Sequence, residues 1–341
     1  MNATMIGFDI AKSVFQAYGE DGSGDVVFQK RLRRSQVEPF FAKLPPATVG
    51  IEACGSAHYW ARTLRALGHE VKLIPAAYVQ PFVKRNKTDA RDAAAICAAL
   101  ARPDMRFVPI KSIEQQAARA LEGSRELLVK HQTQLINSVR GRLAEFGVVS
   151  AQGRCGFATL AAQIKDADPQ IPREVLEALS PLIDELESLA TSIAKLEAKI
   201  VEAAKADAVM RLLTTIPGIG AITAHAIVAA AGTGEQFKSA RDFAAWIGLT
   251  PRQYSSGGKQ RSGGISRRGD RRLRMLLTLG ASTLMRAART RSDRATAWQR
   301  AILARRPTKV AVVAQAAKTA RIAFAILRSG EPYRAPKAAT A

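Results

Sequence analysis

The hydrophobic pattern of the chain changes its period near residue 110. Before that point, short apolar runs alternate with turn residues, whereas after it apolar residues recur at intervals of three, four or seven. Short bounded runs favour β-strands, and the longer period favours amphipathic helices. The sequence therefore predicts an α/β domain over residues 1–110 and all-α regions behind it.

The N-terminal domain is expected to contain both strands and helices in a particular order. Strands are predicted at residues 4–10, 14–18, 25–29, 48–53 and 70–74. Helices are predicted at residues 35–43, 58–67 and 88–100. Three hairpin-like strands followed by alternating strands and helices is the order of an RNase H-like fold, although many α/β folds begin in the same way.

Two long helices are expected in the middle of the chain. The first runs from residue 113 to about residue 146. The second is predicted to start at Ser180-Pro181, with serine as the N-cap and proline as the first helical residue. The apolar residues from Leu182 to Ile200 then alternate between spacings of four and three. That seam indicates an antiparallel or intermolecular coiled coil, or an ordinary amphipathic helix in a bundle.

The same patterns divide the rest of the chain. Residues 111–207 are expected to form a helical coiled-coil region that mediates oligomerisation, and residues 208–330 a further helical domain. The Pro-containing tail at residues 331–341 is expected to be disordered.

The chain is strongly basic. Its 341 residues include 51 Lys and Arg against 29 Asp and Glu, a formal net charge of +22, while 47% of the residues are hydrophobic. That hydrophobic share argues against a disordered basic tail. In a folded chain, so large a charge excess costs stability unless a polyanion binds. Nucleic acid is therefore the first candidate partner, and a ribosome-associated or membrane-surface role is the alternative.

Cysteine usage and the apolar segments indicate a reduced, cytoplasmic protein. Cys54, Cys97 and Cys155 lie far apart and form no metal-binding pattern, so they are expected to be reduced and mostly buried. No signal peptide is recognised at the start of the chain. The apolar stretch over residues 310–327 is interrupted by polar and charged residues. This predicts a helix of a soluble domain and not a membrane span.

Four acidic residues stand where a metal-dependent site for phosphoryl transfer would need them. Asp9 and Glu52 fall on apolar strands, where an unpaired carboxylate is expensive to bury. Asp89 and Asp92 lie three apart at the start of a helix and so share one of its faces. Mg²⁺ prefers such oxygens, and two ions can hold the attacking and leaving oxygens of a phosphodiester. Taken alone, the helical pair also fits acids that stabilise a helix N-terminus, and Asp9 fits an actin-like ATPase.

A glycine-punctuated segment over residues 213–224 has the form of a helix-hairpin-helix. Its turn, Pro-Gly-Ile-Gly, contains Gly218 and Gly220, which let backbone N–H groups approach a phosphate because no Cβ intervenes. The alternative is a tight turn between two core helices. His225, in the second helix, is expected to be a core residue and not a catalyst.

A Gly/Ser-rich basic segment follows. Between residues 252 and 274, eight cations stand against one acid, Asp270. Such a loop is suited to a phosphate backbone, with strongly salt-dependent binding, and the surrounding guanidinium groups could stabilise a phosphate under attack by a serine. On composition alone, a disordered basic loop is the favoured interpretation. The cations singled out for nucleic-acid binding are Arg252, Lys259, Arg261, Arg267 and Arg268.

Together these motifs resemble the insertion-sequence 110 family of DEDD transposases, which includes the related pilin-gene invertases. The resemblance extends along nearly the whole chain, and its motifs, taken in this order, are specific. They are GFDIAK at residues 7–12, IEA at 51–53, KTDARDA at 87–93, IPGIG at 216–220, GLTP at 248–251 and SGGK at 256–259.

The resemblance implies a RuvC-like nuclease domain and roles for individual residues. Ser256 would be the nucleophile that becomes linked to DNA, with the adjacent Ser255 as the alternative. The central helices would build a homodimer or homotetramer. DNA ends, a DNA target and a structured guide RNA encoded by the element would be the partners, in the bacterial cytoplasm at the nucleoid. The residues that would bind Mg²⁺ or Mn²⁺ are Asp9, Glu52, Asp89 and Asp92.

The implied reaction is strand transfer through a serine–phosphate ester. Because Asp92 and Ser256 lie about 160 residues apart, the site is expected to be composite. Two other functions fit the same residues. A hydrolytic nuclease of the Holliday-junction resolvase type would use the tetrad with water and form no covalent intermediate. A non-enzymatic helix-hairpin-helix binder would need neither the tetrad nor the serine.

Overall fold

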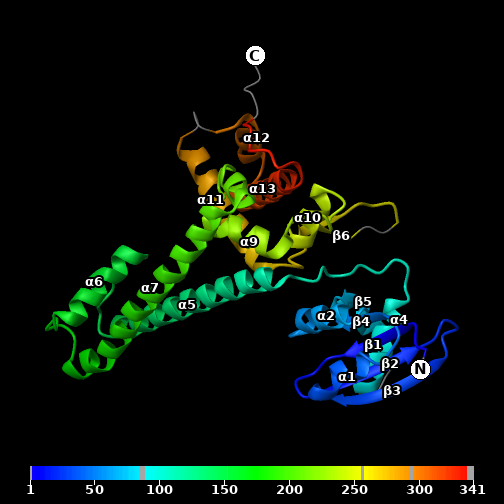
Figure 1. Ribbon diagram of the computed structural model, residues 1–341. Helices are drawn as coiled ribbons and strands as arrows, with labels where there is room; N and C mark the ends of the chain where they lie inside the picture. The colour runs from blue at the N-terminus through cyan, green and yellow to red at the C-terminus, as the bar shows by residue number, and fades with distance from the viewer. Residues whose placement is uncertain (1, 84–88, 152, 255–256, 292–294, 336–341) are drawn as a thin grey trace. The chain divides into compact units, whose positions relative to one another are not determined.

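The computed structural model describes residues 2–83, 89–151, 153–254, 257–291 and 295–335. The chain forms two compact units, Met1–Ser112 and Ile113–Ala341 (Figure 1).

The first unit is built on one mixed sheet. Its order is β3-β2-β1-β4-β5, with antiparallel pairing of β1 to β2 and of β2 to β3, and parallel pairing of β1 to β4 and of β4 to β5. This α/β architecture fits an RNase H-like domain, and every predicted strand is present. The strands are β1 (Met5–Asp9), β2 (Val14–Glu20), β3 (Val26–Arg33), β4 (Thr48–Glu52) and β5 (Glu70–Ile74).

One face of this sheet is covered by aromatic side chains and two helices. Phe8 of β1 packs against Phe15, Phe41 and Trp60, with ring centroids 5.0 to 6.4 Å apart. Phe41 ends α1 and Trp60 belongs to α2, so both helices lie on the Phe8 side. The helix expected at residues 35–43 opens as a 3-10 turn, at whose start the Arg33 N–H donates to Gln36 Oε1 at 2.8 Å. The elements are η1 (Arg34–Gln36), α1 (Val37–Phe41) and α2 (Ala57–Ala66).

The other face of the sheet is covered by α4 (Asp89–Leu100). Gly7 and Gly50, which alternate with Phe8 and Ile51 along their strands, both face this helix. Met5 at the start of β1 packs with the C-terminal half of α4, in a cluster that includes Leu100. The N-terminal turn of α4 therefore lies toward the end of β1. Between β5 and α4 stand α3 (Ala76–Val79) and η2 (Gln80–Phe82).

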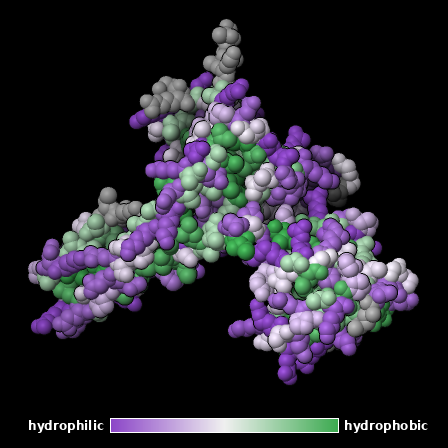
Figure 2. All heavy atoms as spheres, viewed as in Figure 1, coloured by the Kyte–Doolittle hydropathy of each residue, from purple (hydrophilic) through white to green (hydrophobic). Residues whose placement is uncertain are grey.

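The second unit opens with α5 (Ile113–Ala144) and α7 (Arg173–Ala206), which pack antiparallel. Near one end of the pair, Leu143 clusters with Leu179, and toward the other Arg125 Nε donates to Glu197 Oε1 at 2.8 Å. In the sequence, α6 (Arg154–Lys165) comes between these two helices. In Figure 2, hydrophobic side chains gather where these long helices meet. Within the chain, the apolar seam thus faces a neighbouring helix.

The predicted start of the second long helix at Ser180-Pro181 is wrong. The helix begins at Arg173, after Pro172, and continues through Pro181. Pro181 cannot donate to the carbonyl of Glu177, but it lies on the exposed face, where water can replace the missing donor. Upstream of it, Leu179 is already buried and extends the packed face. Leu182 and Leu196 of the expected seam are only partly buried.

The rest of the second unit is a helical body with one small hairpin. Its core gathers apolar residues from α8 to α13, among them Leu213, Ile227, Phe243, Leu277 and Phe324. Figure 1 shows the hairpin projecting beyond α10. The elements are α8 (Ala208–Thr214), α9 (Ala221–Ala231), α10 (Ala240–Ile247), β6 (Pro251–Gln253), β7 (Ser262–Ile265), α11 (Arg271–Thr290), α12 (Ala297–Arg305) and α13 (Thr308–Ser329).

Helix α13 is long and apolar enough to cross a membrane by composition. In the structure it packs against α10 and α11. Two of its polar side chains are buried and bonded to each other, with Gln315 Nε2 donating to Thr319 Oγ1 at 3.1 Å. This packing is that of a core helix, as the sequence predicted. Beyond α13, the Tyr333 N–H donates to Thr215 Oγ1, so this part of the expected tail is anchored.

Candidate active site and nucleic-acid interface

Asp9 and Glu52 end two neighbouring parallel strands. The last register pair between β1 and β4 is Phe8 with Ile51, and each acid follows its member of that pair. By the alternation of side chains along a strand, Asp9 shares the face of Gly7, and Glu52 the face of its own strand's glycine. That is the face covered by α4. Both carboxylates are half-buried.

Gly7 allows α4 to lie directly on the sheet beside these acids. A Cβ on Gly7 would stand 2.0 Å from the carbonyl oxygen of Ala93 and 2.7 Å from the amide nitrogen of Cys97. Asp92, half-buried, precedes Ala93 on the side of the helix nearer the end of β1. Asp89 is the first residue of α4, and its side chain lies outside the described residues. The structure thus brings Asp9, Glu52 and Asp92 to one end of one face.

The loop after Glu52 carries Cys54 and Ser56. Burial, together with the charges of Glu52 and Asp9, raises the pKa of the Cys54 thiol. Cys54 is nevertheless exposed, which corrects the expectation that it is buried, because it lies in the loop between β4 and α2 and not in an element. Two residues later, Ser56 adopts φ 65°, a left-handed conformation that costs energy outside glycine. Such strain is found most often at functional sites.

The described carboxylates offer oxygen ligands but no complete metal cluster. Among the residues whose side chains the structure describes, no group of three or more His, Cys, Asp or Glu is arranged to hold an ion. Cys97 is deeply buried under Gly7, and burial is the main cause that raises its pKa to about 12, so it is a packing residue, as expected. Cys155 lies outside the described side chains.

The Pro-Gly-Ile-Gly turn joins α8 to α9, and its two glycines differ. Gly218 has φ 86°, and a Cβ there would stand 2.9 Å from Leu284 and 3.2 Å from the carbonyl oxygen of Gly280 in α11. Gly218 is therefore required by packing inside the unit. Gly220 caps α9 and has open space where its Cβ would be. Gly220 is exposed, whereas Gly218 is half-buried.

The basic segment forms a hairpin, which corrects the favoured interpretation of a disordered loop. β6 and β7 pair antiparallel, and beyond them the Tyr254 N–H donates to the carbonyl of Arg261 at 2.8 Å. Pairing between the strands supplies order that composition does not reveal. Ser255 and Ser256 lie outside the described residues. All five candidate cations are exposed, namely Arg252, Lys259, Arg261, Arg267 and Arg268.

A buried ionic network was missed by sequence reasoning. Oε1 of Glu122 on α5 lies 2.7 Å from Nδ1 of His225 on α9. The other carboxylate oxygen of Glu122 forms an ion pair with Arg272 of α11. Arg272 Nη1 also donates to the Glu122 carbonyl and to Glu126 Oε2, each at 2.8 Å. His225 is thus a buried, paired core residue, as expected. The only signal in the sequence for Glu122 is an acid beside the apolar stripe of α5.

Known protein families match both the N-terminal and the C-terminal part of the chain. A transposase family model of the DEDD IS110 type matches residues 6–147, and the model for the transposase IS116/IS110/IS902 family matches residues 210–297. A probable family 20 transposase of Pseudomonas aeruginosa is 47% identical over 98% of this chain and 99% of its own length. The transposase for insertion sequence element IS1111A of Coxiella burnetii is 40% identical, over 97% and 91%. The pilin gene-inverting protein of Moraxella bovis is 25% identical, over 98% of each chain. The chain belongs to the IS110 family of transposases.

Proposed function

We propose that the chain is a DNA transposase or recombinase that cuts and rejoins strands with divalent metal on a carboxylate tetrad and through a covalent phosphoserine intermediate. The observation that carries this proposal is the parallel pairing of β1 with β4. Because of this register, Asp9 and Glu52 lie side by side at the ends of the two strands, on the face that α4 covers. Relatives named transposase and gene-inverting protein support a reaction that rearranges DNA. The tetrad is Asp9, Glu52, Asp89 and Asp92.

The donor set suits Mg²⁺, with Mn²⁺ as a substitute. Carboxylate oxygens at half-buried strand ends are the ligands that these ions prefer. When bound, the ions would polarise the phosphodiester and neutralise its developing charge. The chain itself holds the acids in place, because Gly7 seats α4 against β1. Asp89 joins the set on sequence grounds alone.

The serine step is a displacement at phosphorus. The Ser256 hydroxyl oxygen attacks the phosphorus atom, one bridging P–O bond of the strand breaks, and the departing oxygen takes up a proton while the serine loses one. The serine–phosphate ester keeps the energy of the diester. A second DNA hydroxyl then attacks, the serine leaves and regains its proton, and the strand is rejoined with no external energy source.

Two exposed features support binding of DNA and of a structured guide RNA. The five exposed cations at the hairpin can each contact a phosphate, which makes binding depend steeply on salt. Gly220 leaves the N-terminus of α9 open, and helix N-termini favour phosphate. The net charge of +22 fits a chain that binds nucleic acid over a wide surface.

We further assign oligomerisation to the long helices and place the chain at the bacterial nucleoid. Residues 111–207 would form the assembly region of a homodimer or homotetramer, and residues 208–330 the domain that carries the serine. Helix α7, with 34 residues, spans about 50 Å. Leu127 of α5 is exposed and large, a side chain suited to a contact between copies.

The test is covalent trapping. The purified full chain is incubated with Mg²⁺, co-purified RNA and candidate element-end DNA, and resolved on a denaturing gel. The proposal expects a protein–DNA adduct that Ser256→Ala and Asp9→Asn each abolish, whereas Ser255→Ala retains it. Metal-dependent cleavage without any adduct would favour a hydrolytic nuclease, and an adduct that survives Ser256→Ala would reject that serine.

A further inference from the structure

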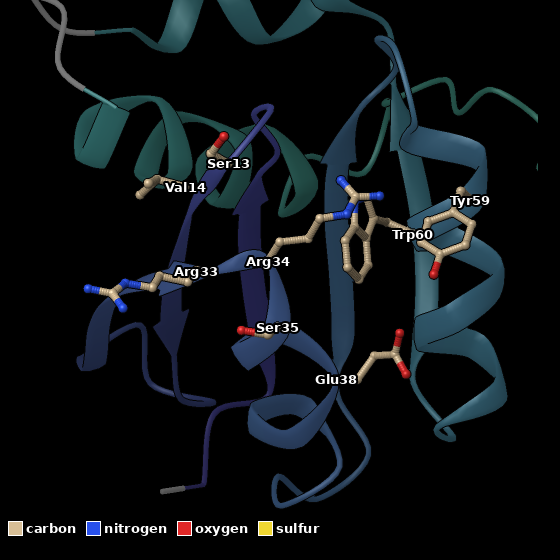
Figure 3. A pocket seen from close by; sticks show the side chains of 8 residues that line it. All are labelled: Ser13, Val14, Arg33, Arg34, Ser35, Glu38, Tyr59 and Trp60. Atoms are coloured by element: carbon tan, nitrogen blue, oxygen red, sulfur yellow. The ribbon is translucent and has the colours of Figure 1, made fainter.

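The first unit carries a pocket that the tetrad does not use. Its volume is about 610 Å³, within the range of small-ligand sites. Three segments form its walls: the start of β2, the end of β3 with η1 and α1, and the start of α2. Figure 3 shows the side chains that line it. They include Ser13, Arg34, Ser35, Glu38, Tyr59 and Trp60.

An arginine and two aromatic rings form the centre of this pocket. The guanidinium carbon of Arg34 lies 5.1 Å from the centroid of the Trp60 ring and 5.9 Å from that of Tyr59. Figure 3 shows the Arg34 side chain extending across Trp60. Trp60 is 2% exposed and fixed in the aromatic core, whereas Arg34 and Tyr59 are exposed. A guanidinium that stacks on a ring keeps its in-plane N–H groups available to an anion.

The charges around Arg34 allow its guanidinium to bind an anionic ligand. Among the residues that the structure describes, no carboxylate is within ion-pair distance of the Arg34 side chain. Glu38 is the pocket's acid, and in Figure 3 it lies on the other side of Trp60 from the Arg34 guanidinium. Exposed Arg33, which also lines the pocket, adds positive charge. An anionic ligand is therefore favoured at the Arg34 end.

The pocket stands where the carboxylate strands end. The loop after Asp9 leads to Ser13, and the loop after Glu52 leads to Tyr59. The acids lie on the α4 face and the pocket on the Phe8 face, so a nucleic-acid strand that passes over this end of the sheet from one face to the other would reach both. Exposed aromatic rings beside cations bind unpaired nucleotides, since every base has a face that can stack.

We propose that this pocket is a nucleotide-binding subsite, in which the base of an unpaired nucleotide stacks on Tyr59 and its phosphate contacts the Arg34 guanidinium. The subsite deepens the proposed function and rests on it, because it holds a strand next to the tetrad. The shared chemistry, an aromatic base and a phosphodiester, belongs to a DNA strand and to a guide RNA alike. Trp60 is the floor that orients Arg34.

The test measures binding without chemistry. Fluorescence anisotropy of the full chain with unstructured labelled oligonucleotides is recorded in EDTA, using DNA and RNA of one sequence. Tyr59→Ala is expected to weaken binding roughly tenfold, from the loss of one stacked base, and Tyr59→Phe to retain it. Arg34→Gln is expected to lower the slope of log affinity against log salt by about 0.7. Tyr78→Ala is the matched control, because Tyr78 is 45% exposed against 44% for Tyr59 and lies outside the pocket.

A second readout does not depend on affinity. Oligonucleotides carrying a 4-thio base are photo-crosslinked, and the adduct is expected on Tyr59 in the tryptic peptide of residues 44–62. Loss of binding with DNA alone assigns the subsite to the substrate strand, and loss with RNA alone assigns it to the guide. Unchanged binding of both probes by Tyr59→Ala and Arg34→Gln, with no crosslink, overturns the subsite. If the adduct test still depends on Ser256 in that case, the proposed function stands without it.

Discussion

Nδ1 of His225 on α9 lies 2.7 Å from Oε1 of Glu122 on α5, and both side chains are almost wholly buried, at 3% and 1% exposure. Arg272, 7% exposed at the start of α11, contacts the other oxygen of the same carboxylate. Arg119 then links Glu122 to Asp270, the residue that caps α11. One buried carboxylate thus ties the long helix to the helices on either side of the basic hairpin.

Removing the charge of Glu122 should destabilise the second unit strongly. Glu122→Gln leaves Arg272 buried with a weaker partner, and breaking a buried pair costs about 3–5 kcal/mol. Urea unfolding monitored on the full chain measures this loss. The control is Glu126→Gln, since Glu126 also contacts Arg272 but is half-exposed, so a cost below about 1 kcal/mol is expected. Equal effects of the two variants would mean that the network does not hold the helices.

Gly7→Ala should displace α4 from the sheet. The added methyl group would overlap backbone atoms of Ala93, which cannot move as a flexible side chain can. We expect a loss of at least about 2 kcal/mol in unfolding free energy and loss of the metal-dependent reaction. Gly22→Ala is the control, because nothing lies within 4 Å of its Cβ position and its φ is not left-handed. A stable, active Gly7→Ala would show that α4 does not position Asp92.

The two glycines of the Pro-Gly-Ile-Gly turn should respond differently. Gly218→Ala combines a left-handed φ with a close approach to α11, and so should lower the melting temperature clearly. Gly220→Ala meets open space, so its stability should stay within about 1 kcal/mol while its affinity for duplex DNA falls. Thermal melts and anisotropy titrations separate the two effects. Wild-type DNA affinity in Gly220→Ala would remove this turn from the interface.

His58 should make the first unit sensitive to acid. Burial, with the positive charges of Lys111 and Arg62, lowers the pKa of His58 to about 4 from its usual 6.5. The folded state therefore prefers the neutral ring, and this preference stabilises the fold fully above pH 6.5 and is lost as the pH falls toward 4. His58 Nδ1 accepts from the Lys111 N–H at 3.2 Å, so protonation also breaks this bond.

The check on His58 is a comparison over pH. The free energy of unfolding is measured for the wild type and for His58→Gln from pH 7 to pH 4, and the fall should be smaller in the variant. The difference between the two curves isolates His58 from the carboxylates, which titrate in both proteins. Parallel curves, or an NMR titration near pH 6.5, would contradict the assignment.

The strands and the ends of most helices could be predicted because their signals are local. Thr48–Glu52 is an apolar run between turn residues, and the observed strand has those bounds within one residue of the prediction. The start of α7 was misjudged because Pro172 and Pro181 each fit a helix start. Only packing, through the burial of Leu179, decides between them.

The features that sequence could not reveal all depend on distant partners. Glu122 and His225 are 103 residues apart, and Arg272 is 150 residues from Glu122, so no local pattern links them. The segment at Tyr254 is ordered by pairing with the strand that follows it, and the composition of the segment does not predict that pairing. The acids on β1 and β4 were found because an apolar strand ending in a carboxylate is unusual in itself. Their shared face required the register between the strands.

The most direct test of the central claim is a titration of the full chain with Mn²⁺, in which binding is measured by electron paramagnetic resonance. We expect the wild type to bind Mn²⁺ and both Asp9→Asn and Glu52→Gln to lose this binding. Asp184→Asn, on the exposed face of α7, should keep it. Undiminished Mn²⁺ binding in the Asp9 and Glu52 variants, or none in the wild type, would contradict a metal site at the ends of β1 and β4.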